Sequence, residues 1–419
     1  DHRDLHSFPT RRSSDLVLLD FPEDISLSAL KLIKLKKSVI KRLTLNGEAT
    51  IAELCKETDF SIPTVTKIIT ELIDEGIVSE TGKMGTAGGR RPSQYGINPN
   101  ACYYLGVEVK RNSVNIGIQD FNNKFIKLSE NISYTLENTR ESLLNLCSII
   151  NQFIADTGVV REKIVGVCIN LSGRINSQKG FSYSYFFFEE KPLSEIIESQ
   201  INIKTFLEND TRAMTYGEYN CGVVRDEKNV IFVNLGIGVG IGIVSDGKLY
   251  YGKSGYSGEF GHSPVFDNEI ICHCGKKGCL ETEISGIALE RKFKQALENG
   301  SNSILSGKKP IDEITVDDIL KAITENEDSL AIEMIDEIGS KLGRYLSMLI
   351  NIFNPELVIL GRSLAETGMY LRLPVKTSVH KYSLSLVSLD MELRTSTLGS
   401  KAGVIGACYI LRDKLFYSV

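Results

Sequence analysis

The sequence predicts a mixed α/β body that follows a small, mostly helical head. From Cys102 onward, apolar strand-like segments alternate with helical ones, and two of them, 104–119 and 230–244, read as strand–loop–strand hairpins. Before residue 98, three helical segments follow one another closely. A chain of 419 residues is also too long for one compact core, so two or three domains are expected.

The composition is that of a globular protein. Hydrophobic residues make up 42% of the chain and charged residues 24%, which is typical of an ordinary soluble globular protein. No apolar run approaches the roughly 18 residues that span a membrane, and no signal peptide is visible. We expect a cytoplasmic protein with no membrane partner. Six cysteines are scattered singly and are expected to be buried, reduced thiols: Cys55, Cys102, Cys147, Cys168, Cys221 and Cys408.

The first residues differ from the rest of the chain. Residues 1–16 show no apolar periodicity and resemble a translated sequencing adaptor, so we exclude them from the fold prediction. We assign residues 17–97 to the head and residues 98–419 to the body.

The head has the pattern of a helix-turn-helix. A helix is predicted over 28–43, and Thr50 with Glu53 forms a capping box that starts a second helix. A third helix follows Ser61 and carries Pro63 in its first turn. Its predicted buried stripe is Val65, Ile68, Ile69, Leu72 and Ile73. Its outward face, which would enter a DNA major groove, carries Thr64, Thr66, Lys67, Thr70 and Glu71.

A glycine-rich segment after the third helix predicts a wing. Strands are predicted at 77–80 and 95–97, and the segment 82–92 between them carries Arg90 and Arg91 for backbone or minor-groove contacts. Residues 28–97 hold 11 Lys/Arg and 8 Asp/Glu, a mildly basic balance in a chain of net charge -5. The alternative is a small helical interaction domain with a flexible basic linker.

A cysteine cluster in the body indicates a metal site. The pattern Cys-x-Cys-Gly-x-x-Gly-Cys places Cys272, Cys274 and Cys279 on a tight loop, and zinc favours four tetrahedral ligands of this kind. His262 is the fourth candidate and His273 its competitor. Four protein ligands would make a closed, structural site, whereas three with water would suggest a catalytic one; bare buried cysteines are the third possibility.

Three segments of the body, with the head, resemble the ROK family (repressors, open reading frames, kinases). They are LENDTRA at 207–213, GYSGEFGH at 255–262 and CHCGKKGCLE at 272–281, and GGRRP at 88–92 resembles the wing of ROK repressors. The resemblance covers about residues 28–419. It implies an actin-like (ribonuclease H-like) fold, the two-lobed fold of sugar kinases, with a ligand cleft between the lobes.

The resemblance also implies site residues. It gives a structural zinc held by His262, Cys272, Cys274 and Cys279. It places six residues in a sugar pocket: Gly173, Asn209, Asp210, Glu259, His262 and Glu281. In kinases of the family the residue that matches Asp210 is the general base. The alternatives are a helix N-cap for Asn209 and Asp210, which is compatible with sugar binding, and solvated surface for Glu259 and Glu281.

The nucleotide side departs from the pattern of the family's kinases. The first hairpin, approximately D-x-G-G-T in those kinases, reads Glu108-Val109-Lys110-Arg111-Asn112 here. The second hairpin keeps its glycines but has Ile237 in place of threonine, and Arg362 replaces the second glycine of a Gly-Gly pair. Phosphoryl transfer depends on positioned phosphates, so we expect no ATP or Mg²⁺ cofactor and no catalysis. The alternative is that these residues still bind ATP.

Together these features predict a sugar-responsive DNA-binding regulator of carbohydrate metabolism genes, acting as a repressor. The expected partners are operator DNA, a sugar or sugar phosphate, and further copies of the chain in a homodimer or homotetramer. The rival hypothesis is an active ATP-dependent sugar kinase, glucokinase-like, with an appended DNA-binding domain. A third is a DNA-binding protein whose body serves only for assembly.

Overall fold

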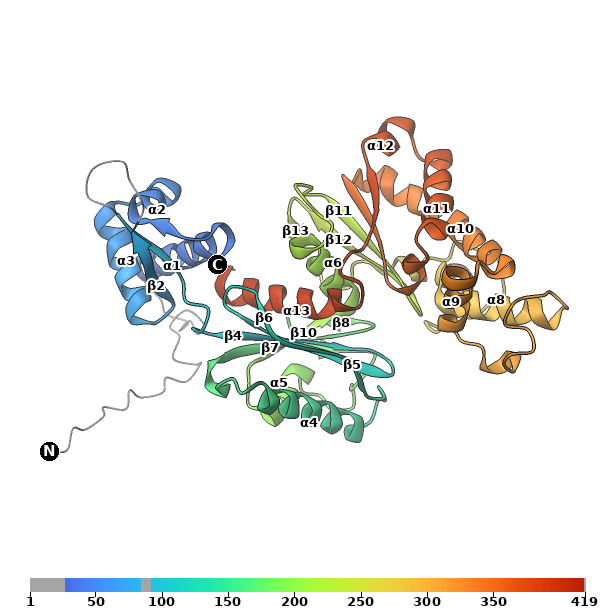
Figure 1. Ribbon diagram of the computed structural model, residues 1–419, viewed down its shortest axis with the longest axis horizontal. Helices are drawn as coiled ribbons and strands as arrows, with labels where there is room; N and C mark the ends of the chain where they lie inside the picture. The colour runs from blue at the N-terminus through green and yellow to red at the C-terminus, as the bar shows by residue number, and fades with distance from the viewer. Residues whose placement is uncertain (1–26, 84–91, 418–419) are drawn as a thin grey trace. The chain divides into compact units, whose positions relative to one another are not determined.

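The body folds around two five-stranded sheets with matching strand orders, β10-β7-β4-β5-β6 and β15-β14-β11-β12-β13. The duplicated architecture predicted from the two hairpins is therefore confirmed. Figure 1 shows the computed structural model, which describes residues 27–83 and 92–417. The described residues up to Gly173, with Lys179–Glu208 and those from Ala407 on, form one unit, and Arg174–Gln178 with Asn209–Gly406 form a second. No helix within the described ranges is both long and apolar enough to cross a membrane.

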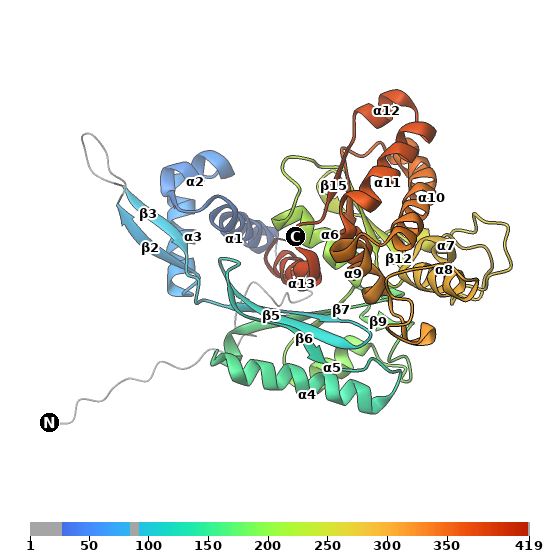
Figure 2. The same cartoon turned by 45° about the vertical axis from the view of Figure 1, so that its right-hand side comes forward.

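The head contains three helices and a small antiparallel sheet (Figure 2). The helices are α1 (Leu27–Asn46), α2 (Ile51–Thr58) and α3 (Ile62–Asp74), and the strands are β1 (Ala49–Thr50), β2 (Val78–Lys83) and β3 (Ser93–Ile97). The predicted capping box is present, because Thr50 Oγ1 accepts from the Glu53 amide and Glu53 Oε2 accepts from the Thr50 amide at 2.8 Å. β1, which pairs with β3, was not predicted.

One prediction for the head needs correction. Ile73, assigned to the buried stripe of α3, is 39% exposed, because the stripe ends with Leu72 in the last full turn of the helix. Ser61 is the N-cap of α3, but its hydroxyl contacts Thr64 Oγ1 at 2.9 Å rather than a backbone amide. Residues 1–16 and most of the predicted wing, 84–91, lie outside the described residues.

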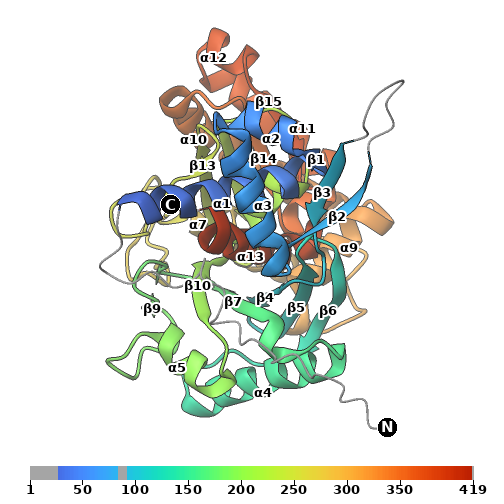
Figure 3. The ribbon, with the colours of Figure 1, turned by 90° about the vertical axis from the view of Figure 1, so that its left-hand side faces the viewer.

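The sheet of the first unit is covered on both faces (Figures 1 and 3). Helices α4 (Arg140–Thr157) and α5 (Leu193–Ile201) cover one face, and the C-terminal part of α13 (Ala402–Arg412) covers the other. The fully buried thiol of Cys408 on α13 lies 3.9 Å from the Tyr104 carbonyl oxygen. In the body, the strands of the first unit are β4 (Tyr103–Val109), β5 (Ser113–Asp120), β6 (Phe125–Ser133), β7 (Ile164–Leu171), β9 (Phe181–Ser182) and β10 (Thr205–Asn209), whereas β8 (Ile175–Asn176) belongs to the second unit.

The sheet of the second unit separates two apolar cores. Ile231, Val233 and Leu235 of β11 face the large core formed with α8, α9 and α10, whereas Val230 and Phe232 face a smaller core with Met214 of α6. The strands are β11 (Val230–Leu235), β12 (Val239–Ser245), β13 (Lys248–Leu249), β14 (Leu357–Gly361) and β15 (Glu392–Thr395). The helices are α6 (Asp210–Cys221), α7 (Glu281–Ile284), α8 (Gly286–Glu298), α9 (Val316–Asn326), α10 (Ser329–Phe353), α11 (Met369–Tyr382) and α12 (Ser385–Leu389).

The prediction for the scattered cysteines holds for four of the six. Cys102, Cys147, Cys168 and Cys408 are buried, and burial raises the pKa of Cys168 to about 12. Cys55 is only half-buried. Cys221 is exposed, because it is the last residue of α6 and precedes the turn at Gly222.

Candidate functional site

The N-terminus of α6 presents two of the predicted sugar-binding residues. Asn209 is the N-cap, and its Oδ1 accepts from the Arg212 amide at 3.1 Å. Asp210 is the first helical residue; it is 7% exposed, and its Oδ1 accepts from the Thr211 amide at 2.7 Å. The amides of a first helical turn stabilise a negative charge there. Asn209 therefore has the capping role considered as the alternative, and Asp210 presents a buried acceptor beside it.

Sequence reasoning missed Arg212 in the same turn. Its guanidinium is almost fully buried and donates to the Gly255 carbonyl at 2.7 Å and the Ile175 carbonyl at 3.3 Å. These bonds tie α6 to the start of the 255–262 segment. The motif contained this arginine, but a charged side chain is ordinarily assigned to the surface.

The glycines of the 255–262 segment let it lie against β12. A Cβ at Gly258 would stand 2.1 Å from the Ile241 carbonyl oxygen, and one at Gly261 would stand 2.2 Å from that of Val239. Only glycine permits such an approach. The segment then presents Glu259, whose Oε2 lies 3.7 Å from His262 Nε2.

The structure brings His262 together with the three clustered cysteines. Their four ligand atoms lie within 4.8 Å of one another. The His262 Nδ1–Cys272 Sγ distance is 3.5 Å and the Cys274 Sγ–Cys279 Sγ distance is 3.6 Å. Zinc–sulfur bonds of about 2.3 Å in a tetrahedron place ligand atoms about 3.8 Å apart, so the four residues fit zinc. His262 also turns its second nitrogen toward Glu259, the usual arrangement behind a metal-bound histidine.

His273, the competing ligand, is paired with Glu281. The His273 Nδ1–Glu281 Oε1 distance is 2.9 Å, and Glu281 Oε2 accepts from the Val239 amide at 2.9 Å. Burial alone would raise the pKa of Glu281, but these two donors hold it below its usual range. A Cβ at Gly238 would stand 2.5 Å from Glu281 Oε2. Glu281 is therefore buried, not solvated, and joins the cysteine loop to the β11–β12 hairpin.

Gly173 belongs to the first unit, whereas the other five predicted sugar-pocket residues belong to the second. Its φ of 92° and the Ser184 side chain, 2.3 Å from where a Cβ would lie, both require glycine. Gly173 is therefore fixed by its own backbone conformation and by the packing of the neighbouring loop.

The nucleotide side carries a strained residue. Arg362 directly follows β14 and has φ 71° and ψ −173°, a conformation adopted almost only by glycine. Its Cγ lies 3.6 Å from the point where a Cβ of Gly236 would stand, so its side chain runs along the second glycine hairpin. Ile237 in that hairpin is 51% exposed.

The outward face of α3 is open to solvent. Thr66, Lys67 and Thr70 are exposed and Thr64 is half-buried. The Lys67 side chain is 70% exposed, and its ammonium lies 3.9 Å from Glu71. Arg90 and Arg91 fall outside the described residues.

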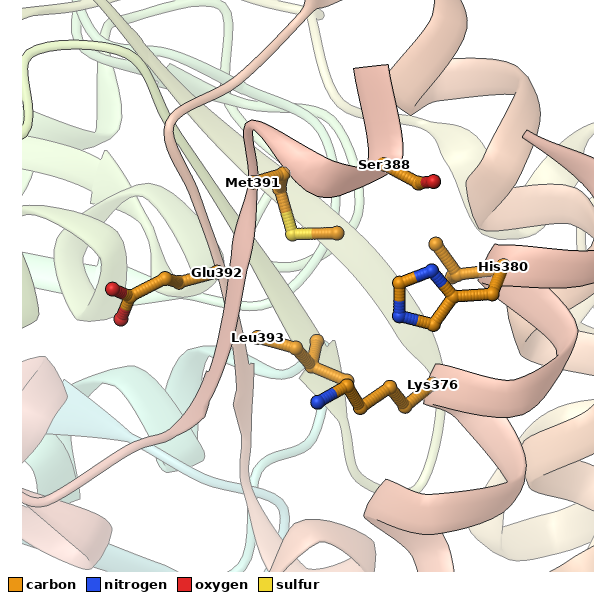
Figure 4. A pocket seen from close by; sticks show the side chains of 7 residues that line it. Lys376, His380, Ser388, Met391, Glu392 and Leu393 are labelled. Carbon is orange, nitrogen blue, oxygen red and sulfur yellow. The ribbon is translucent and has the colours of Figure 1, made fainter. Parts of the chain in front are cut away.

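A separate hollow lies between α11, α12 and β15 (Figure 4). It encloses about 250 Å³ and is lined by residues that include Lys376, His380, Met391 and Leu393. Its lining includes none of the described residues predicted to bind sugar, metal or DNA.

Comparison with known proteins extends over both parts of the chain. Residues 104–414 match the model of the ROK family, and residues 34–79 match a winged helix-turn-helix DNA-binding model. A putative xylose repressor of Caldicellulosiruptor sp. (strain Rt8B.4) is 27% identical over 91% of this chain and 96% of its own length. The DNA-binding transcriptional dual regulator NagC of Escherichia coli K12 is 27% identical over 88% and 90%.

The solved structures agree with this. The crystal structure of a ROK family transcriptional regulator, a homologue of the E. coli Mlc protein, has a TM-score of 0.79 and 26% identity, covering 92% of this chain and 97% of that one. The predicted fold is confirmed: a two-lobed, actin-like α/β body with an N-terminal winged helix-turn-helix.

Proposed function

The chain belongs to the ROK family, and on that premise we propose that it is a sugar-responsive repressor of carbohydrate metabolism genes. One observation carries the proposal: a winged helix-turn-helix with an open recognition face shares a chain with a body that presents sugar-type acceptors, of which Asp210 is buried, Asn209 half-buried and Glu259 exposed. The full-length relatives include regulators named for xylose and N-acetylglucosamine.

The DNA part of the proposal rests on α3. Its exposed Thr66, Lys67 and Thr70 face solvent while its opposite stripe is buried, so these side chains are available to a major groove. Proteins of this type read two half-sites related by two-fold symmetry. We therefore infer a homodimer or homotetramer in the cytoplasm, bound to a palindromic operator.

The ligand part rests on Asn209, Asp210 and Glu259. A sugar presents several hydroxyl groups, and carboxylate or carboxamide oxygens accept from them. Asp210 and Glu259 offer such oxygens in the second unit. Sugar binding would favour one conformation of the body over another and thereby change the affinity of the heads for DNA.

We further infer that His262, Cys272, Cys274 and Cys279 hold a structural zinc. The support is that four soft or borderline ligand atoms lie within 4.8 Å of one another and that the Glu259 carboxylate lies behind His262. Four protein ligands leave no open position for a reacting water, so the zinc would stabilise the loops that carry Glu259 and Glu281.

The test uses the full chain and an operator selected from random DNA by the protein itself. D-glucose, D-xylose, N-acetyl-D-glucosamine and their phosphate esters are titrated into the complex, and release is followed by fluorescence anisotropy. We expect one of them to release the DNA, and Asp210→Asn to blunt that release. Lys67→Ala should weaken binding to all sequences and reduce the salt slope by about 1, whereas Lys34→Ala on α1 should not.

A coupled ADP-release assay distinguishes the rival kinase. We expect no turnover on these sugars, because Arg362 and Ile237 occupy the nucleotide side and alignment supplies much of the rate of phosphoryl transfer. Robust turnover that Asp210→Asn abolishes would make the protein a kinase.

A further inference from the structure

The carboxamide of Asn234 is a buried polar group with an open acceptor. Asn234 is the fifth residue of β11 and is 9% exposed. Its Nδ2 donates to Thr211 Oγ1 at 2.8 Å, but its Oδ1 has no hydrogen-bond partner among the residues that the structure describes. Nearly all buried polar atoms are paired, so an exception points to a donor supplied by something else.

The chain of contacts from Asp210 fixes which way this amide points. Asp210 Oδ1 accepts from the Thr211 amide at 2.7 Å and from the Thr211 hydroxyl at 3.4 Å. The Thr211 hydroxyl proton is therefore directed to Asp210, and its lone pair is left to accept from an N–H. Asn234 must then present Nδ2 to Thr211 and turn Oδ1 away from it.

The acceptor lies beside the second glycine hairpin. A Cβ at Gly236 would stand 3.7 Å from Asn234 Oδ1, and one at Gly240 would stand 3.1 Å from Thr211 Oγ1. Both glycines of the hairpin therefore lie directly against the Asn234–Thr211 pair. The aliphatic stem of Arg362 lies against the same hairpin, with its Cγ 3.6 Å from the point where a Cβ of Gly236 would stand. All of these residues belong to the second unit.

We propose that Asn234 is a specificity-determining residue of the ligand site: its Oδ1 accepts a hydrogen bond from a hydroxyl of an unphosphorylated sugar. The inference rests on the proposed function and narrows its ligand class. A neutral hydroxyl can donate to Oδ1 next to the Asp210 carboxylate. A phosphate ester near pH 7 is largely dianionic; it would bring acceptor oxygens against Oδ1 and a like charge toward Asp210.

The experiment measures sugar affinity by isothermal titration calorimetry on the full chain. Wild type is titrated with D-glucose, D-xylose and N-acetyl-D-glucosamine, and then with the monodeoxy analogues and the phosphate ester of the tightest of them. Asn234→Leu removes the Oδ1 acceptor and keeps a side chain of similar volume. Asn234→Ser has a shorter side chain, whose hydroxyl does not reach the position of Oδ1. Asn234→Asp keeps an acceptor oxygen at that position. Asn220→Leu, at the other end of α6, is the matched control.

We expect Asn234→Leu and Asn234→Ser to weaken the sugar about 3- to 10-fold, the effect of one lost hydrogen bond. One monodeoxy analogue should bind wild type more weakly by a similar factor, and that discrimination should vanish in both variants but persist in Asn234→Asp. A merely structural role for Asn234 would not remove discrimination at a single hydroxyl. The phosphate ester should bind wild type more weakly than the free sugar, and Asn220→Leu should match wild type.

Two results would overturn the inference alone: unchanged deoxy-sugar discrimination in Asn234→Leu and Asn234→Ser, or tighter wild-type binding of the phosphate ester than of the free sugar. If wild type binds none of the three sugars, the proposed sugar function falls, and this inference falls with it. If Asn234→Leu does not fold, the result for Asn234→Ser decides the test.

Discussion

The strained backbone at Arg362 makes a quantitative prediction about stability. At an ordinary exposed helix position, glycine is less stable than alanine by about 0.5–1 kcal/mol, because it loses more freedom on folding. At Arg362, φ 71° and ψ −173° cost any residue with a Cβ about 1–3 kcal/mol. The difference predicts that Arg362→Gly has a higher free energy of unfolding than Arg362→Ala by about 0.5–2 kcal/mol.

Comparing the two variants cancels the loss of the arginine side chain, which both share. For a unit of this size, the difference corresponds to about 1–8 °C in melting temperature, measured by scanning calorimetry. The control is Arg372, an exposed residue within α11, where the order of the glycine and alanine variants should reverse. Equal stabilities at position 362, or a more stable alanine variant, would refute the strain argument.

Three further predictions concern the metal, pH dependence and packing. Freshly purified protein should contain one zinc per chain by elemental analysis, and Cys279→Ser should lose it. Cys221→Ser is the control and should keep the zinc, since Cys221 is exposed and lies outside the cluster. Wild-type protein without zinc would contradict the metal site. Lys309 and the capping of Thr315 lower the pKa of Asp318 to about 2, so the stability that this carboxylate adds is present above about pH 4 and is lost as the pH falls toward 2. Asp318→Ala should then lower the free energy of unfolding, measured by urea denaturation, by about 1 kcal/mol at pH 7 and by less at pH 3. An equal loss at both pH values would refute this pH dependence. Gly406→Ala should destabilise the body by about 1–3 kcal/mol, because its Cβ would stand 1.7 Å from the Ala213 carbonyl oxygen of α6; an unchanged melting temperature would contradict that packing.

Local sequence patterns predicted the elements whose structure depends on interactions between residues that are close in the sequence. The capping box at Thr50 and Glu53 and the two hairpins follow from hydrogen bonding within a few residues or from apolar periodicity. The metal cluster was equally accessible, because three of its four ligands lie within eight residues of chain.

Contacts between distant segments were not accessible in the same way. The buried guanidinium of Arg212 donates to the carbonyl groups of Ile175 and Gly255. Both partners are distant in the sequence, and no residue near position 212 predicts these contacts. Asn234 was missed for a similar reason: in a β-strand of apolar residues, one asparagine gave no sign that it would reach Thr211. Glu281 was assigned to the pocket, but its pairing with His273 and Val239 depended on how the cysteine loop closes.

The C-terminal helix α13 has a consequence for how this gene can be rearranged. The helix begins in the second unit, against α6, and ends in the first, against the sheet strand that carries Tyr104. A premature stop codon between Ala402 and Gly406 would therefore remove packing from both units at once, whereas one after Gly406 would remove residues of the first unit alone. The head joins the body through the short connection between Ile97, where β3 ends, and Tyr103, where β4 begins, and α1 also meets the C-terminal segment, where Lys41 Nζ lies 5.5 Å from the centre of the Tyr417 ring. Recombination at that short connection could therefore exchange one DNA-reading head for another only where the incoming first helix also fits the C-terminal segment.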